Sequence, residues 1–151
     1  MIEKPWSGRR CVVHIPFGTY LISDDKSRLD LETVLGFLQR SYWAKAREAE
    51  RTKKAIENSR CYGVYDAEGR QVAFARVITD GATAYYLCDV FVDENHRGSG
   101  IGKAMVEAII GSEELKGITG MLATADAHGL YEKYGFVKDA ERFMRKPIVP
   151  N

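Results

Sequence analysis

The spacing of hydrophobic residues changes several times along the chain, and each change predicts a different element. Near the N-terminus, two β-prone runs at residues 11–15 and 20–23 flank Pro16-Phe17-Gly18. Short apolar runs bounded by proline and glycine are typical of strands joined by a turn. This segment therefore predicts a hairpin or two separate strands.

Helical spacing begins after Asp30, a residue type that caps helices. The apolar residues that follow recur at the spacing of a single buried stripe, namely Leu31, Val34, Leu35 and Leu38. A second helix, rich in Ala, Lys, Arg and Glu, is expected over residues 46–57. Between the two helices, the loop Ser41-Tyr42-Trp43 either packs against the core or forms a wall of a substrate pocket.

Three strand-like runs follow, at residues 61–65, 71–78 and 84–92. The residues between them, 66–69 and 80–81, contain the Asp and Gly of hairpin turns. These three runs predict an antiparallel meander.

Helices and strands alternate in the last third of the chain. We expect helices at residues 100–110 and 127–134, a strand at 120–124, and two final strands at 136–138 and near Phe143. Alternation after a meander predicts an α/β (α+β) fold, with a mixed, mainly antiparallel sheet of six to seven strands and helices on both faces.

Composition narrows the classes of protein that this chain belongs to. Its 151 residues suffice for one domain with a full core. The 22 Lys+Arg against 21 Asp+Glu leave no surplus of positive charge for binding nucleic acid or a membrane surface. We expect neither partner.

The three cysteines, Cys11, Cys61 and Cys88, are odd in number and far apart, so free thiols are expected rather than a disulfide framework or a metal site. The first ten residues carry charge where a secretion signal is apolar, and no run reaches the roughly 18 apolar residues of a membrane span. These observations predict a cytoplasmic protein without a metal cofactor.

Candidate chemistry is concentrated in a glycine-rich turn between the run ending at Val92 and the helix expected at 100–110. Three glycines within residues 98–102 let backbone N–H groups converge beside a helix N-terminus, which favours phosphate. The turn is not a nucleotide-hydrolase loop, because Ala104 follows Lys103 where Ser or Thr would bind magnesium. It is not a dinucleotide fingerprint either, because it reads GxGxG.

The turn Arg97-Gly-Ser-Gly-Ile-Gly102 resembles the R/Q-x-x-G-x-G/A loop of the GNAT acyltransferase superfamily. A second segment, residues 127–136, is similar to that family's A-x-x-L-Y-E-K-x-G-F signature, and the wider pattern resembles a bacterial subgroup. The resemblance covers residues 21–146. It implies a single N-acetyltransferase domain over residues 1–151, with residues 1–20 as a local extension.

The resemblance also implies which residues bind acetyl-CoA. The strand Val90-Phe91-Val92 would offer main-chain groups to the pantetheine arm. The turn would hold the pyrophosphate through Arg97, Gly98, Ser99, Gly100, Ile101, Gly102 and Lys103. Thr124 stands where many members have an asparagine that contacts pantetheine, so this contact comes from Thr124 or from the backbone alone. Nearby Asp126 is expected to cap the last helix instead.

For catalysis, Tyr131 matches the family tyrosine that protonates the CoA sulfur as general acid. Asp89 is the one carboxylate in an apolar strand, a position that requires a partner or a function. Two readings stay open for it: a base or ammonium-binding anion, which points to a cationic amine, or a structural ion pair with Arg76. Tyr42 and Trp43 are expected on the acceptor side.

The leading hypothesis is an acetyl-CoA-dependent N-acetyltransferase that acts by direct attack on a primary amine of a small molecule or side chain. The alternatives are an acyltransferase for longer acyl groups or hydroxyl acceptors, and a CoA-binding sensor or inactive scaffold. A homodimer is also open, because residues 120–122 and the terminal strand are suited to joining a partner's sheet edge.

Overall fold

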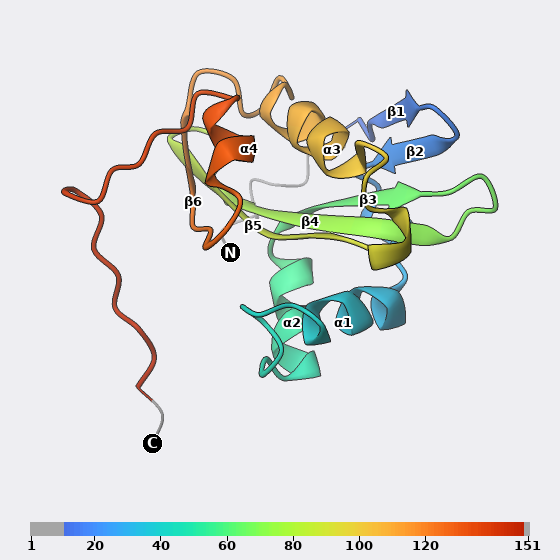
Figure 1. Cartoon of the computed structure of the whole chain (residues 1–151), viewed down its shortest axis with the longest axis horizontal. Coiled ribbons are helices and arrows are strands. Elements are labelled where there is room, and N and C mark those ends of the chain that lie inside the picture. Colours follow the sequence, from blue (N-terminus) through green and yellow to red (C-terminus); the bar gives the residue numbers. More distant parts are fainter. Residues whose placement is uncertain (1–10, 150–151) are drawn as a thin grey trace, which may run out of the picture.

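The computed structural model describes residues 11–149 and shows a sheet between two pairs of helices (Figure 1). Two 3₁₀ turns, Lys26–Arg28 and Glu94–His96, complete the elements. The strands and helices are β1 (His14–Phe17), β2 (Tyr20–Ser23), α1 (Leu31–Gln39), α2 (Ala49–Glu57), β3 (Arg60–Tyr65), β4 (Gln71–Thr79), β5 (Ala84–Val92), α3 (Ile101–Ile110), β6 (Thr119–Leu122) and α4 (His128–Glu132).

Within the described residues the six strands follow one another across the sheet in sequence order, from β1 to β6. All neighbours are antiparallel except β5 and β6, which are parallel. The hairpin of β1 and β2, the meander of β3, β4 and β5, and the mixed, mainly antiparallel sheet are therefore confirmed.

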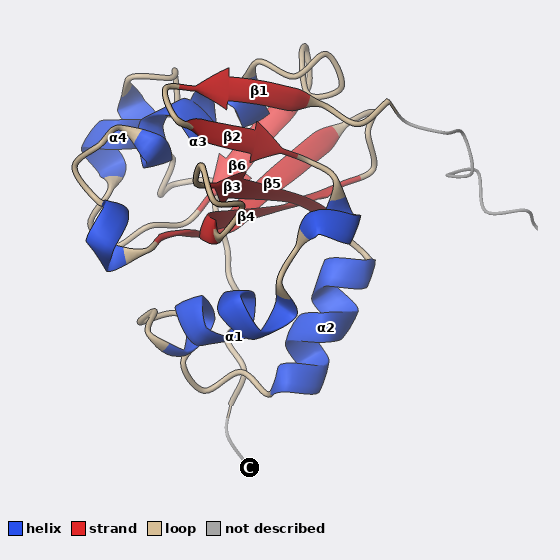
Figure 2. Ribbon diagram, turned by 90° about the vertical axis from the view of Figure 1, so that its right-hand side faces the viewer, coloured by secondary structure: helices blue, strands red, loops and turns tan. Residues whose placement is uncertain are grey.

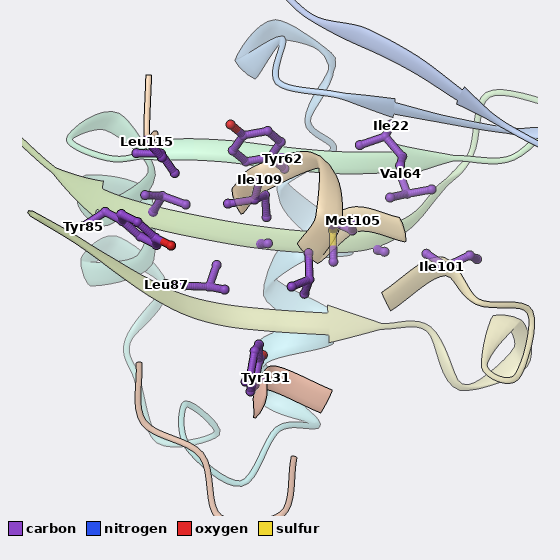
Figure 3. Packing of buried hydrophobic residues seen from close by; sticks show 14 of the residues in the cluster. Ile22, Tyr62, Val64, Tyr85, Leu87, Ile101, Met105, Ile109, Leu115 and Tyr131 are labelled. Atoms are coloured by element: carbon purple, nitrogen blue, oxygen red, sulfur yellow. The ribbon is translucent and has the colours of Figure 1, made fainter. Parts of the chain in front are cut away.

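Helices cover both faces of the sheet, as expected (Figures 1 and 2). On one face, α3 buries Ile101, Met105 and Ile109 against sheet residues such as Val64 and Leu87, and Tyr131 of α4 joins the same cluster (Figure 3). On the other face, the buried side chains of α1 and α2 surround Phe74 and Phe91. The sheet thus supports two separate hydrophobic clusters.

The polar residues at the ends of the helices explain the local boundaries. Asp30 caps α1, since its carboxylate accepts a hydrogen bond from the backbone N–H of Thr33 at 3.1 Å. The second helix begins at Ala49 rather than at 46, because the preceding residues form turns. In that loop the hydroxyl of Ser41 accepts from the N–H of Ala44 and donates to the carbonyl of Leu38.

The two final strands expected at residues 136–138 and near Phe143 are wrong for the part of the chain that the structure describes. After α4 the chain has no strand up to residue 149 and runs away from the body (Figure 1). The side chains of Val137 and Met144 are 82 and 94 % exposed. The β-prone residues of these two segments have no neighbouring strand in this arrangement, and a strand needs such a partner to pair its backbone.

The segment expected as an N-terminal extension, residues 1–20, contains β1, which pairs with β2 at the edge of the sheet. Its first ten residues lie outside the described part of the chain. Across residues 11–149, none of the helices has the length and apolar character that crossing a bilayer requires.

Candidate active site

The last two strands of the sheet, β5 and β6, separate at the end that leads to the glycine-rich turn. β6 pairs with the first half of β5, from Ala84 opposite Thr119 to Leu87 opposite Leu122, where β6 ends. β5 continues through Val90-Phe91-Val92, so this side of the strand has no neighbouring strand among the described residues. An unpaired strand edge carries N–H and C=O groups that are able to bind an extended ligand.

A β-bulge lies in this part of β5. The pairing with β4 passes from Cys88 opposite Arg76 to Phe91 opposite Phe74, so two residues of β5 face one residue of β4. The first of the two, Asp89, has φ +52°, which is uncommon for a residue other than glycine. The bulge interrupts the alternation of the strand and turns Asp89 toward α1 and α2, on the face opposite Leu87.

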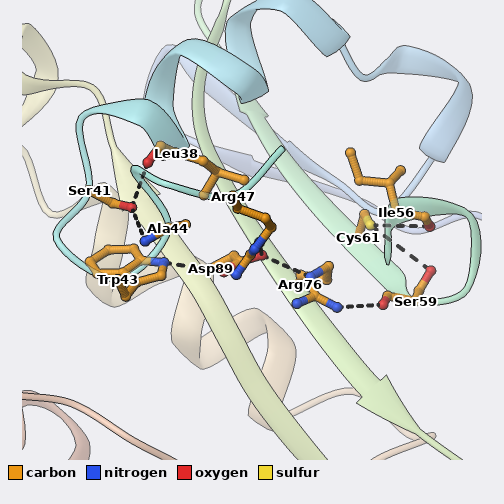
Figure 4. Close-up of polar contacts among 10 residues, drawn as sticks. All are labelled: Leu38, Ser41, Trp43, Ala44, Arg47, Ile56, Ser59, Cys61, Arg76 and Asp89. Atoms are coloured by element: carbon orange, nitrogen blue, oxygen red, sulfur yellow. Dashed lines mark hydrogen bonds and ion pairs between the residues drawn. The ribbon is translucent and has the colours of Figure 1, made fainter. Parts of the chain in front are cut away.

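The carboxylate of Asp89 is buried and accepts hydrogen bonds from three side chains (Figure 4). Arg47 donates from Nη1 to Oδ2 at 2.7 Å and from Nη2 to Oδ1 at 3.1 Å. Arg76 donates from Nε to Oδ2 at 2.9 Å, and Trp43 from Nε1 to Oδ1 at 3.2 Å. Arg76 is itself held by the hydroxyl of Ser59 at 3.0 Å.

The ion pair between Asp89 and Arg76, one of the two roles left open by the sequence, is present. Burial alone would raise the pKa of Asp89, but the hydrogen bonds and charges of Arg47 and Arg76 outweigh burial and lower it. Two guanidinium groups around one carboxylate carry a net charge of +1. The cluster therefore does not present the uncompensated anion that would attract a cationic amine.

Tyr42 and Trp43 connect this cluster to the other side of the strand opening. Their rings meet edge to face, with centroids 4.9 Å apart, and both side chains remain partly exposed. Trp43 donates to Asp89, whereas the hydroxyl of Tyr42 accepts from the N–H of Ala125 at 3.0 Å, just beyond β6. The aromatic loop thus spans the space between β5 and the connection from β6 to α4.

Tyr131 lies on α4, and its ring is buried against Phe136 with centroids 6.0 Å apart. It lines an open groove along β6 and α4. Burial, followed by the nearby Tyr42 and Asp126, raises the pKa of Tyr131 to about 12. A tyrosine hydroxyl is protonated at neutral pH, as a proton donor must be, and the raised pKa keeps it so.

The glycine-rich turn has the backbone geometry that its sequence predicts. Gly98 and Gly100 have φ values of +85° and +83°, in the left-handed region that favours glycine. Gly100 caps α3, and no described side chain bonds to the free N–H groups of the first turn. Such an exposed helix N-terminus is suited to phosphate oxygens. The donors present therefore fit the pyrophosphate of a CoA ester.

The side chains of the turn have different roles. Arg97 folds back on β5: its Nε donates to the carbonyl of Val92 at 3.0 Å, and its guanidinium lies 5.2 Å from the centroid of Phe91. Ser99 bonds within the turn to the carbonyl of His96, and Ile101 is buried in the core. Lys103 is exposed on the first turn of α3. The groups of this segment that are not engaged within the protein are thus mainly backbone N–H groups and the side chain of Lys103.

The predicted capping role of Asp126 is wrong. α4 begins after Ala127 without a side-chain cap, and the hydroxyl of Thr124 accepts from the N–H of Ala127 at 3.0 Å. A threonine hydroxyl that accepts from the N–H three residues on stabilises the turn that Asp126 was expected to stabilise. Thr124 still lines the groove beside Tyr131.

Sequence analysis did not identify Arg47, whose hydrogen bonds are the largest of the effects that lower the pKa of Asp89. It lies 42 residues before Asp89 and resembles the other basic residues around α2. The only available signal was general: a buried carboxylate requires cationic partners. A metal site is a separate question. Among the residues placed by the structure, no group of three or more potential metal ligands occurs.

Comparison with known proteins identifies the family. Residues 57–138 match the model of the acetyltransferase (GNAT) domain. The chain belongs to the GNAT acetyltransferase family. A Gibberella zeae protein described as an acetyltransferase is 31 % identical over 149 residues, covering 83 % of both chains. Serotonin N-acetyltransferase 2 of Oryza sativa subsp. japonica is 32 % identical over 101 residues, covering 63 % of this chain and half of that protein.

Among solved structures, a GNAT-family protein of Xanthomonas campestris pv. campestris superimposes with a TM-score of 0.82 and 40 % identity. The match covers 89 % of this chain and 95 % of that one. The GNAT fold inferred from the two sequence motifs is thereby confirmed over nearly the whole length of the chain.

Proposed function

We propose that this GNAT protein transfers an acetyl group from acetyl-CoA to a primary amine of a small molecule or side chain. The observation that carries the proposal is the placement of a protonated, buried tyrosine, Tyr131, beside the opening between β5 and β6. The glycine-rich turn begins at the far end of the same β5 edge.

The proposed cofactor contacts follow the order of the elements. The backbone N–H groups of residues 98–103 and the side chain of Lys103 would hold the pyrophosphate. The outer edge of Val90-Phe91-Val92, where the carbonyl of Val92 also accepts from Arg97, would pair with the pantetheine arm, with Thr124 on the opposite wall. Acetyl-CoA supplies a thioester whose carbonyl carbon accepts the amine. The backbone N–H groups at the bulge are suited to stabilising the oxyanion that forms.

In the proposed reaction the amine nitrogen forms a bond to the carbonyl carbon, and the carbon–sulfur bond breaks. The nitrogen loses a proton to solvent, the departing thiolate takes a proton from the hydroxyl of Tyr131, and the tyrosinate regains a proton from solvent. Direct attack is favoured over an acyl-cysteine step, because burial raises the pKa of the neighbouring Cys88 to about 12. A protonated thiol is a weak nucleophile.

We assign Asp89 a positioning role in this scheme. Its two oxygens are occupied by Arg47, Arg76 and Trp43, and its lowered pKa makes it a weak base. By holding Trp43 and the bulge, it would fix the acceptor wall relative to the thioester. A pH–rate profile of Asp89→Asn tests the base role: loss of the acidic limb would restore Asp89 as the base.

The proposed function is tested first by binding and then by turnover. We expect acetyl-CoA to raise the melting temperature, with longer acyl-CoA esters as comparison ligands. A panel of amines, and of alcohols, is then assayed by release of the free CoA thiol. Stabilisation without thiol release from any acceptor would favour the CoA-binding sensor, and no stabilisation by any CoA ester would contradict the proposal.

A further inference from the structure

The cluster formed by Arg47, Arg76 and Asp89, which we call the cationic cluster, carries more positive than negative charge. Both arginines pair with the one carboxylate, and within residues 11–149 neither forms an ion pair with another acidic side chain. The side chain of Arg76 is only 11 % exposed, so water screens this charge less than at the surface. The cationic cluster is therefore suited to an anionic ligand.

Both arginines keep donors that the described part of the protein does not use. Each Nη atom of Arg47 gives one hydrogen to Asp89, which leaves the second hydrogens and Nε without a partner within residues 11–149. Nη2 of Arg76 likewise makes no hydrogen bond with a described residue. Arg47 is accessible, because 24 % of its side chain is exposed. A guanidinium with unused N–H groups binds carboxylate and phosphate oxygens.

A further cation acts on the same strand. Burial first, and then Cys88 and Asp89, raise the pKa of the Tyr86 hydroxyl on β5. The positive charges of Arg76 and Arg145 oppose this rise. Arg145 lies on the exposed segment that follows α4, so a cation from the end of the chain adds to the positive field along β5.

The wall beside the cationic cluster is aromatic. Tyr42 and Trp43 are 56 and 41 % exposed, although hydrogen bonds fix both side chains, Tyr42 at Ala125 and Trp43 at Asp89 (Figure 4). Exposed rings that are held in one place are suited to the apolar part of a small ligand.

We propose that the acceptor is an amine that also carries an acidic group, a carboxylate or a phosphate, and that Arg47 binds this group. The inference rests on the proposed acetyl transfer and specifies its acceptor. Arg47 contacts the side chain of Asp89, whose backbone belongs to the bulge proposed to hold the thioester carbonyl. The acidic group and the reacting nitrogen are therefore only a few bonds apart, as in an amino acid or an aminoalkyl phosphate.

The same arrangement disfavours amines without an acidic group. Both oxygens of Asp89 are engaged by side chains of the protein, so the cationic cluster has no carboxylate left for an ammonium group. An amine that brings only positive charge meets like charge at this wall, which weakens its binding. The acidic group of the acceptor removes this repulsion and stays chemically unchanged in the reaction.

The first experiment compares acceptors that differ only in the acidic group. Amino acids are paired with the amines that lack the carboxylate, such as tryptophan with tryptamine, and phosphoethanolamine is paired with ethanolamine. Release of the free CoA thiol gives kcat/KM for each. We expect the acidic member to be favoured by about tenfold or more in one type of pair, which separates carboxylate from phosphate. Equal or better turnover of the amines without an acidic group would overturn the inference and leave acetyl transfer intact.

Arg47→Gln tests the residue, with Arg51→Gln, an exposed arginine on α2, as the matched control. Only Arg47→Gln should bring the ratio of the two kcat/KM values close to 1. A merely structural defect lowers both values and leaves their ratio unchanged, and that outcome would overturn the role of Arg47. If Arg47→Gln does not fold, Arg47→Lys replaces it. Its ratio should fall at least threefold, because an ammonium group held by Asp89 has fewer donors to offer.

Binding is measured separately, so that the result does not depend on turnover. N-acetyl amino acids, N-acetylphosphoethanolamine and the matching neutral amides are titrated by calorimetry in the presence of CoA. The acids of one type should bind about tenfold more tightly to the wild type than to Arg47→Gln, whereas the neutral amides should not distinguish the two proteins. Such binding without thiol release from any acceptor would contradict acetyl transfer but support the anion site. Equal binding of acids and neutral amides, or no binding of any acid, would overturn the inference.

Discussion

Arg47 and Asp89 form a bidentate ion pair that joins the connection between α1 and α2 to the bulge in β5. The side chain of Asp89 is only 2 % exposed, whereas that of Arg47 is 24 % exposed. The pair therefore lies at the boundary between the core and the proposed acceptor side of the site.

Substitution of Asp89 by Asn should destabilise the protein. The change leaves Arg47 and Arg76 side by side without a carboxylate, and removing one partner of a buried ion pair costs about 3–5 kcal/mol. We expect a decrease of this order in the free energy of unfolding, measured by urea denaturation. Glu50→Gln, which removes the exposed pair with Lys53, should change it by less than about 1 kcal/mol.

The same pair predicts a dependence of stability on pH. Because the pKa of Asp89 is lower in the folded state than the ordinary value of about 3.9, its contribution is complete above that value. It is lost as the pH falls through the folded pKa. The difference in unfolding free energy between the wild type and Asp89→Asn should be constant from pH 7 to 5 and shrink below about pH 4. A constant difference down to pH 2 would contradict this account.

Tyr131→Phe should lower turnover at least tenfold with nearly unchanged affinity for acetyl-CoA, because only the proton donor is removed. Tyr134→Phe is the control: Tyr134 lies three residues on and lines the same groove, but its hydroxyl is engaged as a donor to Glu107 at 2.9 Å. Steady-state kinetics and calorimetric binding separate the two effects. Equal turnover in Tyr131→Phe and wild type would remove the tyrosine from the mechanism.

Gly98→Ala should weaken binding of acetyl-CoA. The left-handed conformation of this residue costs a non-glycine residue about 1–2 kcal/mol. If the turn of the variant leaves this conformation in the free protein, it must regain it to bind acetyl-CoA. The dissociation constant for acetyl-CoA then increases roughly 5- to 30-fold. Gly36→Ala, in the middle of α1, is the control. A Cβ added there would meet only Nη1 of Arg40, at 3.5 Å, so binding should be unchanged. Titration calorimetry of both variants decides the outcome.

Cys88→Ala should keep its turnover within a few-fold of wild type, because the buried thiol is protonated and direct attack does not require it. Steady-state assays with both substrates varied should give intersecting rather than parallel lines. Loss of activity together with a trapped acetyl-cysteine would show that a two-step reaction operates instead.

Local signals in the sequence were sufficient for most of the fold. The cap residue Asp30 and the apolar stripe that follows it both predict α1. The Asp and Gly residues between the strand-like runs predict the meander of β3, β4 and β5. The last strands failed for the opposite reason. Phe143 and its neighbours have the composition of a strand, but a strand also needs a partner, which local composition does not report.

The site divides in the same way. Gly98 and Gly100 adopt positive φ values, which glycine accepts readily, so the residue types alone made the turn predictable. The environment of Asp89 was not, because Arg47 and Trp43 reach it through the path of the chain rather than through any local pattern. The sequence indicated that Asp89 needs a partner and offered Arg76, but it could not identify Arg47.

The bulge also has a consequence for the order in which the protein folds. Asp89 joins residues 13, 42 and 46 positions away, Arg76, Arg47 and Trp43, whereas the glycine-rich turn is built from consecutive residues. Contacts between residues far apart in the sequence form more slowly, because closing the long loop between them costs entropy. During synthesis or refolding, both parts need the sheet, because α3 packs on β3, β4 and β5. The turn then closes only a few residues, whereas the acceptor wall also needs the connection between α1 and α2 to reach Asp89.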